Sequence, residues 1–210
     1  RLEHHSNIVP WQILATEKRF KIEVIELNED GSLDESSLNE KLALNPKLVA
    51  ISHGSNTLGT VNDVKRITAL AHSVGATVIV DGSQAVPHKT IDVTDIDCDF
   101  YVASGHKMYG PSGIGFLYGK HSLLEQMPPW RGGGEMIASV SFEEPTTFNI
   151  PPYKFEAGTP HLSGVVGLGA AIDWLNSVGL EKIAAHEKSL IEYASRELMK
   201  IDGMRLIGTA

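Results

Sequence analysis

Short apolar runs alternate with amphipathic stretches along most of the chain. The runs at residues 47–52, 76–80, 100–103 and 114–118 have the length and composition of buried strands. Between two of them, residues 62–74 place apolar side chains on one helical face, and a glycine follows. This order of strand, helix and strand predicts an α/β fold with a mainly parallel sheet and right-handed crossovers.

The remaining segments predict further elements. Residues 22–27 alternate apolar and polar side chains, which indicates a strand. Residues 34–44 keep leucines at helical spacing until an Asn-Pro pair ends the helix. Residues 164–171 carry small side chains and continue into residues 172–175, which favours a closely packed helix. Residues 180–201 form a long amphipathic helical pattern, and residues 204–208 indicate the start of another strand.

Candidate chemistry lies where two of the predicted strands end. Asp81 directly follows one strand, and the segment 104–107, Ser-Gly-His-Lys, follows another. Ligands of α/β sheets bind at the carboxyl ends of the strands. An aspartate and Lys107 at neighbouring strand ends suit pyridoxal 5′-phosphate (PLP), because its ring nitrogen needs an anionic partner and its aldehyde forms a Schiff base with an amine. Taken singly, such a lysine is usually a solvated loop residue, and such an aspartate is often a turn former or a helix cap.

Two longer motifs surround these residues. Asp81 stands in Val-Ile-Val-Asp-Gly-Ser-Gln-Ala, and Lys107 ends Asp-Phe-Tyr-Val-Ala-Ser-Gly-His-Lys. Together the motifs resemble the cofactor site of the class-V, fold-type I PLP enzymes and, more narrowly, of the group II cysteine desulfurases of the SufS/CsdA type. The similarity runs from Glu-His-His-Ser-Asn-Ile-Val-Pro-Trp at residues 3–11 to Gly-Thr-Pro at residues 158–160 and the helices after it.

The resemblance implies a fold and a division into domains. The fold is the large domain of fold-type I PLP-dependent transferases, with a mainly parallel seven-stranded-type sheet in three α/β/α layers. Residues 1–175 would form the PLP-binding large domain without its N-terminal part. Residues 176–210 would form a long helix and the start of a smaller C-terminal domain. We therefore expect a fragment that lacks both ends of the family's chain. It would also lack the family's reactive cysteine and carboxylate-binding arginine, and it would be inactive alone.

The resemblance also implies roles for particular residues. Lys107 forms the Schiff base and takes the α-proton of the substrate, Asp81 keeps the ring nitrogen protonated, and His4 lies flat on the ring. The other contacts to PLP within the chain are assigned to polar side chains near the strand ends, namely Asn56, Gln84, Ser104 and His106. On sequence context alone, His4 also fits a solvated turn, and Asn56 fits a turn asparagine.

The resemblance implies partners and an activity. Thr159 would reach the cofactor phosphate across the interface of a homodimer. The activity would convert L-cysteine to L-alanine and pass the sulfur, as a persulfide, to an acceptor protein of iron–sulfur cluster assembly. Alternatives are a selenocysteine lyase acting on L-selenocysteine, another class-V enzyme such as an aminotransferase or epimerase, and a non-catalytic interaction module. Retention of Lys107 together with the other cofactor residues argues against the last.

Charge and cysteine content narrow the partners and the compartment. The formal net charge is −8, which argues against nucleic acid or an anionic membrane as the main partner. No apolar run reaches transmembrane length and the opening residues do not form a signal peptide, so we expect a cytoplasmic protein. The single cysteine, Cys98, fits a reducing compartment and a structural role, since Asp97 and Asp99 disfavour its thiolate. The adjacent histidines near the start lack zinc-ligand spacing, and no metal site is predicted.

Overall fold

The computed structural model describes residues 1–209. Its α-helices are α1 (Val9–Lys18), α2 (Glu35–Leu42), α3 (Val64–Ser73), α4 (Val93–Ile96), α5 (His121–Gln126), α6 (Leu162–Val178) and α7 (Leu180–Leu198). Its 3-10 turns are η1 (His5–Asn7), η2 (Gly105–Met108) and η3 (Tyr153–Phe155). Its strands are β1 (Leu48–Ser52), β2 (Thr77–Asp81), β3 (Phe100–Ser104), β4 (Gly115–Gly119), β5 (Ile137–Ser139) and β6 (Thr147–Phe148).

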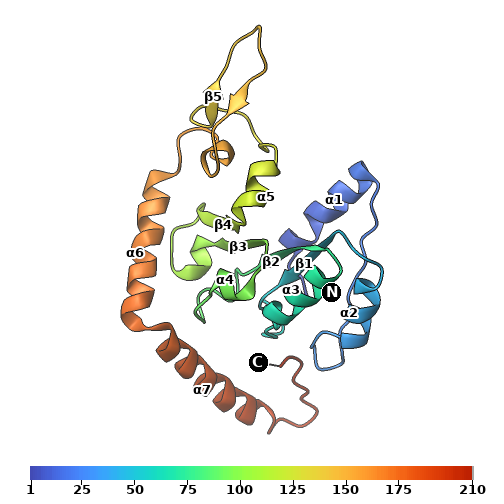
Figure 1. The fold of residues 1–210 in the computed structure, drawn as a ribbon. Helices are drawn as coiled ribbons and strands as arrows, with labels where there is room; N and C mark the ends of the chain where they lie inside the picture. The colour runs from blue at the N-terminus through green and yellow to red at the C-terminus, as the bar shows by residue number, and fades with distance from the viewer. Residues whose placement is uncertain (210) are drawn as a thin grey trace.

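The main sheet contains four strands in the order β1, β2, β3 and β4 (Figure 1). The first three are parallel, and β4 runs antiparallel to β3. The register pairs Ser52 with Asp81 and Asp81 with Val102, so the carboxyl ends of the parallel strands meet at one edge. The predicted α/β class with a mainly parallel sheet is confirmed, although residues 1–209 contribute four strands to this sheet rather than a seven-stranded type.

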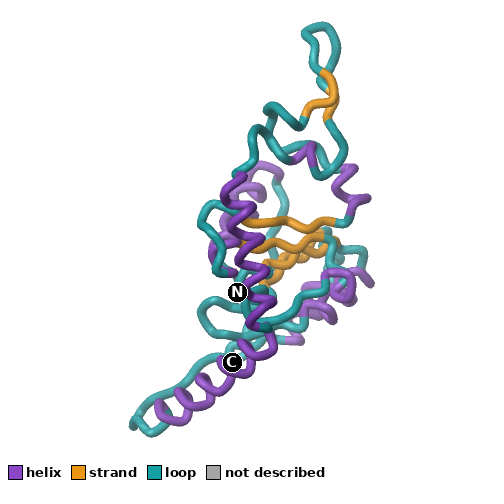
Figure 2. Tube along the Cα trace, turned by 90° about the vertical axis from the view of Figure 1, so that its left-hand side faces the viewer, coloured by secondary structure: helices purple, strands orange, loops and turns teal. Residues whose placement is uncertain are grey.

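Helices lie on both sides of the strands (Figure 2). Two of them begin where the sequence predicts, because Asp34 and Asp63 cap α2 and α3 by accepting hydrogen bonds from backbone N–H groups of the first turn. Their apolar faces pack against the sheet, and α6 contributes to the same cluster. The core contains Leu38, Leu42, Val49, Ile51, Val64, Ile67, Ala71, Val78, Val80, Tyr101, Leu168 and Leu175.

Two segments extend away from the sheet. Helix α6 runs along one side and α7 leads away beyond its end, while the β5–β6 hairpin projects from the other end of the molecule (Figure 1). The helices predicted over residues 164–175 and 180–201 are confirmed, although the second ends at Leu198. The predicted domain boundary after residue 175 falls within α6, and the chain breaks its helical path at Gly179, where φ is +93°. The division into two domains stays a prediction.

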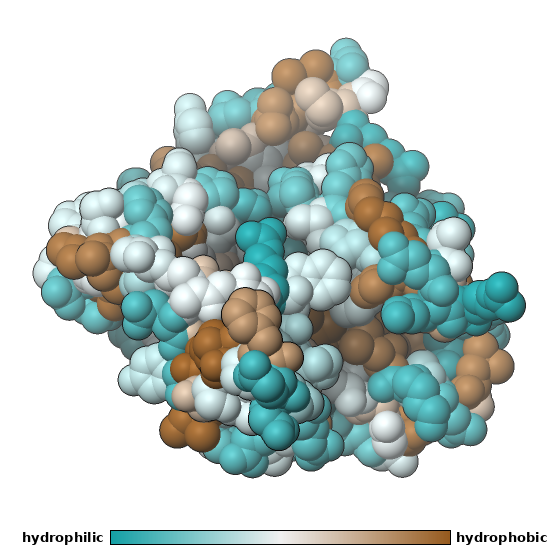
Figure 3. Space-filling view, turned by 90° about the horizontal axis from the view of Figure 1, so that it is seen from above, coloured by the Kyte–Doolittle hydropathy of each residue, from teal (hydrophilic) through white to brown (hydrophobic). Residues whose placement is uncertain are grey.

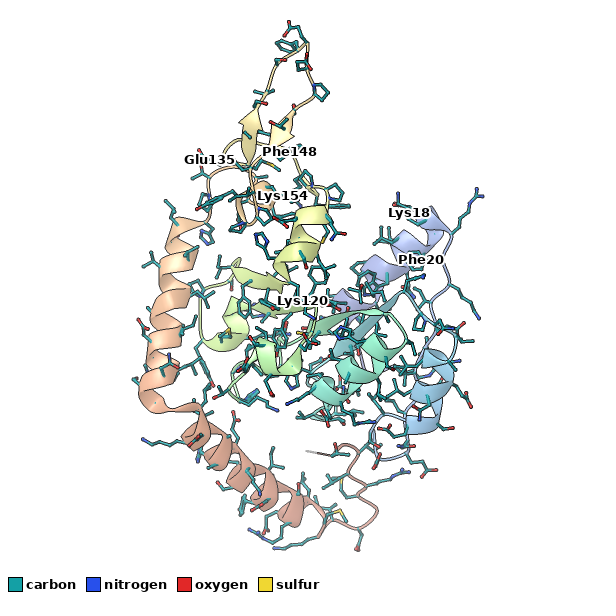
Figure 4. The ribbon with its side chains drawn as sticks, in the orientation of Figure 1. Lys18, Phe20, Lys120, Glu135, Phe148 and Lys154 are labelled. Atoms are coloured by element: carbon teal, nitrogen blue, oxygen red, sulfur yellow. The ribbon has the colours of Figure 1, made fainter. Side chains whose placement is uncertain are left out.

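The base of the hairpin is held by polar contacts, whereas its outer part is exposed. Lys154 is only 8% exposed and its ammonium donates to the Glu125 carbonyl oxygen at 2.9 Å. Asn149 Nδ2 donates to the Glu135 carbonyl oxygen at 2.9 Å, beside Phe148 (Figure 4). Beyond this base, Phe142 is fully exposed, and apolar residues stand among polar ones on the face from which the hairpin projects (Figure 3).

Both predicted strands outside the sheet are wrong. Residues 22–27 are not a strand. Their last residue, Leu27, pairs with Leu33 in an isolated antiparallel bridge. The backbone of Glu26 is occupied elsewhere, because its N–H donates to Ser37 Oγ and its carbonyl oxygen accepts from the Asp34 N–H. A strand ladder is therefore not available at this point. Residues 204–208 are also not a strand, since their backbone enters a turn from residue 201 and is largely exposed.

An ion-pair network lies at the opposite edge of the sheet from Asp81. The carboxylate of Asp99 accepts from the Val78 N–H at 2.7 Å and contacts His72 Nε2 at 2.9 Å and Lys120 Nζ at 3.2 Å (Figure 4 labels Lys120). Although burial opposes it, these hydrogen bonds hold the pKa of Asp99 below its ordinary value of 3.8. The contribution of Asp99 to the free energy of unfolding is therefore complete when the pH is well above 3.8. It is lost as the pH falls through the lower pKa of the folded state.

We expect Asp99→Asn to lower the free energy of unfolding at pH 7 by about 3 kcal/mol, because the variant leaves His72 and Lys120 without their buried anion. Urea unfolding followed by circular dichroism measures this change. Asp95→Asn is the matched control, since Asp95 pairs with Lys65 on the surface and its loss is expected to leave the midpoint unchanged. Equal midpoints for Asp99→Asn and the native chain would contradict a stabilising network.

The hydroxyl of Thr68 is buried in α3 without a hydrogen-bond partner among residues 1–209. Valine has the same shape and no polar group to desolvate. We expect Thr68→Val to keep or raise the free energy of unfolding, by up to about 1 kcal/mol. Thr68→Ala is the control, because it also removes the hydroxyl but leaves a cavity. A loss of stability in the valine variant, measured by urea unfolding, would indicate that the hydroxyl has a partner in solution.

Candidate active site

The carboxyl edge of the parallel strands carries the predicted acid. Asp81 is the last residue of β2, between Ser52 of β1 and Val102 of β3, and is only 9% exposed. Its Oδ1 accepts from the Ser83 N–H at 3.0 Å. No other hydrogen bond from residues 1–209 reaches this carboxylate. Asp81 is therefore a nearly buried side chain that retains acceptor capacity at the edge where α/β proteins bind ligands.

The loops that follow β1 and β2 lie against each other. A Cβ atom added to Gly54 would lie 3.4 Å from the Gln84 carbonyl oxygen, so the two backbones are in close contact. A Cβ atom added to Gly82 would lie 2.0 Å from the ring of Tyr101, which leaves room for glycine alone after Asp81. The loop that carries Asn56 and the loop that carries Gln84 are thereby brought together. The Gln84 side chain is half-buried and Asn56 is exposed.

The segment after β3 turns at once into η2, which carries the predicted lysine. Gly105 is required there, because a Cβ atom would lie 2.9 Å from both the side chain and the carbonyl oxygen of Ile114. Ser104 Oγ lies 2.8 Å from Nδ1 of the exposed His106. Lys107 is half-buried, and its ammonium has no hydrogen bond or ion pair among residues 1–209. The segment thus presents a hydroxyl, an imidazole and an uncommitted amine.

His4 begins η1 near the same edge. The backbone N–H of Ser6 donates to His4 Nδ1 at 3.2 Å, and Ser6 Oγ lies 2.7 Å from the same nitrogen. A backbone N–H only donates, so this hydrogen-bond pattern assigns the ring proton to Nε2. The imidazole is exposed. The preceding residue, Glu3, connects η1 to the sheet, because its Oε1 accepts from the Ser52 N–H at 2.9 Å.

A buried pair of side chains lies next to Asp81. His53 follows β1 directly, and its Nδ1 lies 3.0 Å from the hydroxyl of Tyr101 on β3. Burial, assisted by the positive charge of Lys89, lowers the pKa of His53 to about 4. Burial raises the pKa of Tyr101, and the negative charges of its surroundings, including Asp81, act in the same direction. The pair is therefore neutral at pH 7 and bridges the two outer parallel strands.

Thr159 lies in another part of the chain. It is exposed in the loop before α6, where the neighbouring Gly158 N–H donates to the Gly134 carbonyl oxygen at 3.0 Å. Within the described residues no hydrogen bond or ion pair connects Thr159 with Asp81 or Lys107. The structure thus brings the strand-end residues together and leaves Thr159 apart. Its role across a homodimer interface stays a prediction.

The chemistry of the side chains at this edge fits PLP. A carboxylate suits the ring nitrogen, an amine suits the aldehyde, and hydroxyl, imidazole and amide groups suit the phosphate and the phenolic oxygen. These groups come from Asp81, Lys107, Ser104, His106, Gln84 and Asn56, and the strand register and loop contacts described above hold most of them at one edge. Cys98 lies outside this set: it is buried, and its pKa is raised to about 11, chiefly by burial, which fits the predicted structural role.

Comparison with protein families identifies the chain. The family described as "Aminotransferase class-V" matches residues 1–210. The chain belongs to the class-V aminotransferase family. The resemblance on which the sequence analysis rests is therefore confirmed at the level of the family. PLP is the cofactor of this class-V family and of the related cysteine desulfurases.

Relatives of this class-V chain are named cysteine desulfurases. One from Serratia proteamaculans is 52% identical over 209 residues, which are 100% of the chain and 52% of that protein. One from Dickeya dadantii is 51% identical over 99% of the chain and 50% of that protein. The chain spans about half the length of the curated relatives that it matches.

Solved structures agree with this assignment. The cysteine desulfurase CsdA from Escherichia coli, with an S-sulfonic acid, superposes with a TM-score of 0.91 at 42% identity, covering 96% of the chain and 50% of that structure. The apo cysteine desulfurase from Thermococcus onnurineus NA1 gives a TM-score of 0.90 at 37% identity, covering 94% of the chain and 49% of that structure. Among residues 1–209, none of the helices has the length and hydropathy that a bilayer-spanning segment needs.

The sequence alone assigns no role at this edge to Glu3, His53 or Tyr101. Glu3 stands beside His4 in the motif that carries the resemblance. The local signal for a role of Glu3 is that an acidic residue follows the apolar Leu2. His53 opens the polar segment after β1, and Tyr101 lies within an apolar strand. Neither pattern indicates that their side chains meet, because the contact depends on how β1 and β3 flank β2.

Proposed function

We propose that this chain is the catalytic core of a PLP-dependent cysteine desulfurase that converts L-cysteine to L-alanine. The observation that carries the proposal is the strand edge where Asp81 lies nearly buried and Lys107 offers an uncommitted amine, in a chain 50–52% identical to proteins named cysteine desulfurase. The sulfur would leave as a persulfide for an acceptor protein of iron–sulfur cluster assembly.

The proposed residues divide the work of holding the cofactor. When bound, PLP supplies an aldehyde for covalent attachment and a ring that withdraws electrons from the α-carbon of the substrate. Asp81 would hold a proton on the ring nitrogen through its remaining acceptor capacity. Ser104 and His106 would bind the phosphate, and Gln84 and Asn56 would donate to the phenolic oxygen.

Two side chains would act on the substrate or orient its surroundings. Lys107 would accept the α-proton of L-cysteine at Nζ, which requires the neutral amine during turnover. His4 would pack on the face of the ring, with the Ser6 N–H keeping its Nδ1 as an acceptor. Thr159 would complete the phosphate site of a partner subunit, so the enzyme would work as a homodimer in the cytoplasm.

The direct test measures L-alanine formed from L-cysteine by the full-length protein loaded with PLP. We expect stoichiometric L-alanine and persulfide or sulfide, with L-selenocysteine assayed in parallel to separate a desulfurase from a selenocysteine lyase. Formation of pyruvate, of an amino-group transfer product or of D-cysteine without L-alanine would assign another class-V reaction. Binding of PLP with no turnover of any of these amino acids would favour a non-catalytic module.

A further inference from the structure

The carboxylate of Glu3 joins the start of the chain to the sheet at the candidate active site. Its Oε1 accepts from the Ser52 N–H at 2.9 Å, and its Oε2 accepts from Asn7 Nδ2 at 2.5 Å. The amide oxygen of Asn7 in turn accepts from Trp11 Nε1 at 2.9 Å. One carboxylate thus ties the last residue of β1 to η1 and, through Asn7, to the first turns of α1.

The position of this carboxylate is unfavourable for a purely structural clamp. Burial raises the pKa of Glu3, and the negative charge of Asp81 acts in the same direction. Asp81 is the register partner of Ser52, whose N–H the Glu3 side chain binds, so the two acidic side chains occupy neighbouring strand ends. A glutamine in its place would offer only one acceptor oxygen to the two donors, so this double hydrogen bond requires a second acidic side chain beside Asp81.

His4 stands inside the turn that Glu3 holds. The His4 carbonyl oxygen accepts from the Asn7 N–H at 2.8 Å, and the His4 ring accepts from the Ser6 N–H. These hydrogen bonds close the turn over residues 4–7. The Glu3 side chain joins this turn to β1. Without the Glu3 carboxylate, the Ser52 N–H and the Asn7 amide lose their shared acceptor, and the imidazole is free to shift with the turn.

We infer that Glu3 is a positioning residue that holds the His4 imidazole at the carboxyl edge of β1 and β2. The inference rests on the proposed function, in which His4 packs on the cofactor ring. Glu3 acts through His4 and the turn, and touches neither substrate nor cofactor. The carboxylate matters because it accepts from a backbone N–H and a side-chain amide at once, a geometry in which each oxygen has its own donor.

The test compares Glu3→Ala, Glu3→Gln and the exposed control Glu17→Ala in the full-length protein. The readouts are the dissociation constant for PLP and the visible circular dichroism of bound PLP, which reports how the ring is held. We expect Glu3→Ala to weaken PLP binding about tenfold and to reduce the dichroic band, as loss of hydrogen bonds to a charged acceptor implies. Glu3→Gln keeps an oxygen for the Ser52 N–H but places an NH2 group against the Asn7 Nδ2 donor, so we expect an intermediate loss of both signals, while Glu17→Ala should match the native protein.

A double-mutant cycle separates positioning from general stability. In a His4→Ala background, we expect Glu3→Ala to change the dichroic band and the PLP affinity no further, because the group that it positions is already gone. Additive losses in that background would overturn the inference, and so would a native dichroic band in the single Glu3→Ala variant. If Glu3→Ala does not fold, Asn7→Ala removes the other half of the clamp and is judged by the same criteria.

The same experiments distinguish this inference from the proposed function. Failure of the native protein to bind PLP at Lys107 would remove the proposed function and the inference together. Normal binding at Lys107, with Glu3→Ala indistinguishable from the native protein in affinity and dichroism, would overturn the role of Glu3 alone.

Discussion

Replacing Lys107 with alanine is expected to abolish covalent attachment of PLP and to lower L-alanine formation at least about a thousandfold. The physical reason is that η2 carries Lys107 directly after β3, the strand beside the one that ends in Asp81, and its Nζ is not committed to an ion pair or hydrogen bond among residues 1–209. Its loss removes both the attachment point and the group that would take the α-proton. The measurements are the visible absorption band with added PLP and the rate of L-alanine formation in the full-length protein.

Lys18→Ala provides the matched control for this lysine. Lys18 is exposed at the end of α1, far along the chain from the strand ends, and Figure 4 labels it. We expect this variant to keep the absorption band and the native rate. A Lys107→Ala protein that folds and still turns over L-cysteine at a rate within tenfold of the native one would contradict the assigned role.

Asp81→Asn is expected to lower the rate of L-alanine formation about a hundredfold to a thousandfold while leaving the fold intact. Asparagine has the same shape and keeps an oxygen that can accept from the Ser83 N–H, so the end of β2 should remain as it is. It lacks the negative charge that would hold a proton on the ring nitrogen, and that charge is worth most where water is excluded. The measurement is kcat for L-alanine formation, with urea unfolding as the check on stability.

The control for this charge is Asp173→Asn on the exposed part of α6, which we expect to be neutral in both measurements. The same two measurements separate a structural role of Asp81 from an electrostatic one. If Asp81→Asn lost PLP binding and stability together while Asp173→Asn lost neither, Asp81 would be a structural residue of the sheet edge. Retention of kcat within a few-fold in a stable Asp81→Asn protein would contradict its electrostatic role.

Much of the sheet could be predicted because each strand is a short apolar run with its own boundaries. The run before Asp81 and the run before Ser104 both become strands, and the parallel order places their ends side by side. The same rule explains why the candidate site could be located from the sequence. Chemistry-bearing residues that directly follow parallel strands need no long-range information beyond the order of the strands.

The failures have a common physical cause. Alternation at residues 22–27 describes the spacing of side chains but not whether a partner strand exists, and the Glu26 backbone instead bonds to Ser37 and Asp34. Glu3 could not be assigned a role, because its partner, the Ser52 N–H, lies 49 residues later in the chain. The meeting of His53 with Tyr101 likewise depends on packing across β2 rather than on any local pattern.

The central claim is that Lys107 is the residue that binds PLP covalently, and borohydride trapping tests it most directly. The full-length protein is incubated with PLP, reduced with borohydride, digested and mapped by mass spectrometry. We expect a single pyridoxyl adduct, located on Lys107 within the peptide Ser-Gly-His-Lys, and no adduct at this position in Lys107→Ala. An unmodified Lys107 in a folded protein, or a specific adduct on a different lysine, would contradict the account.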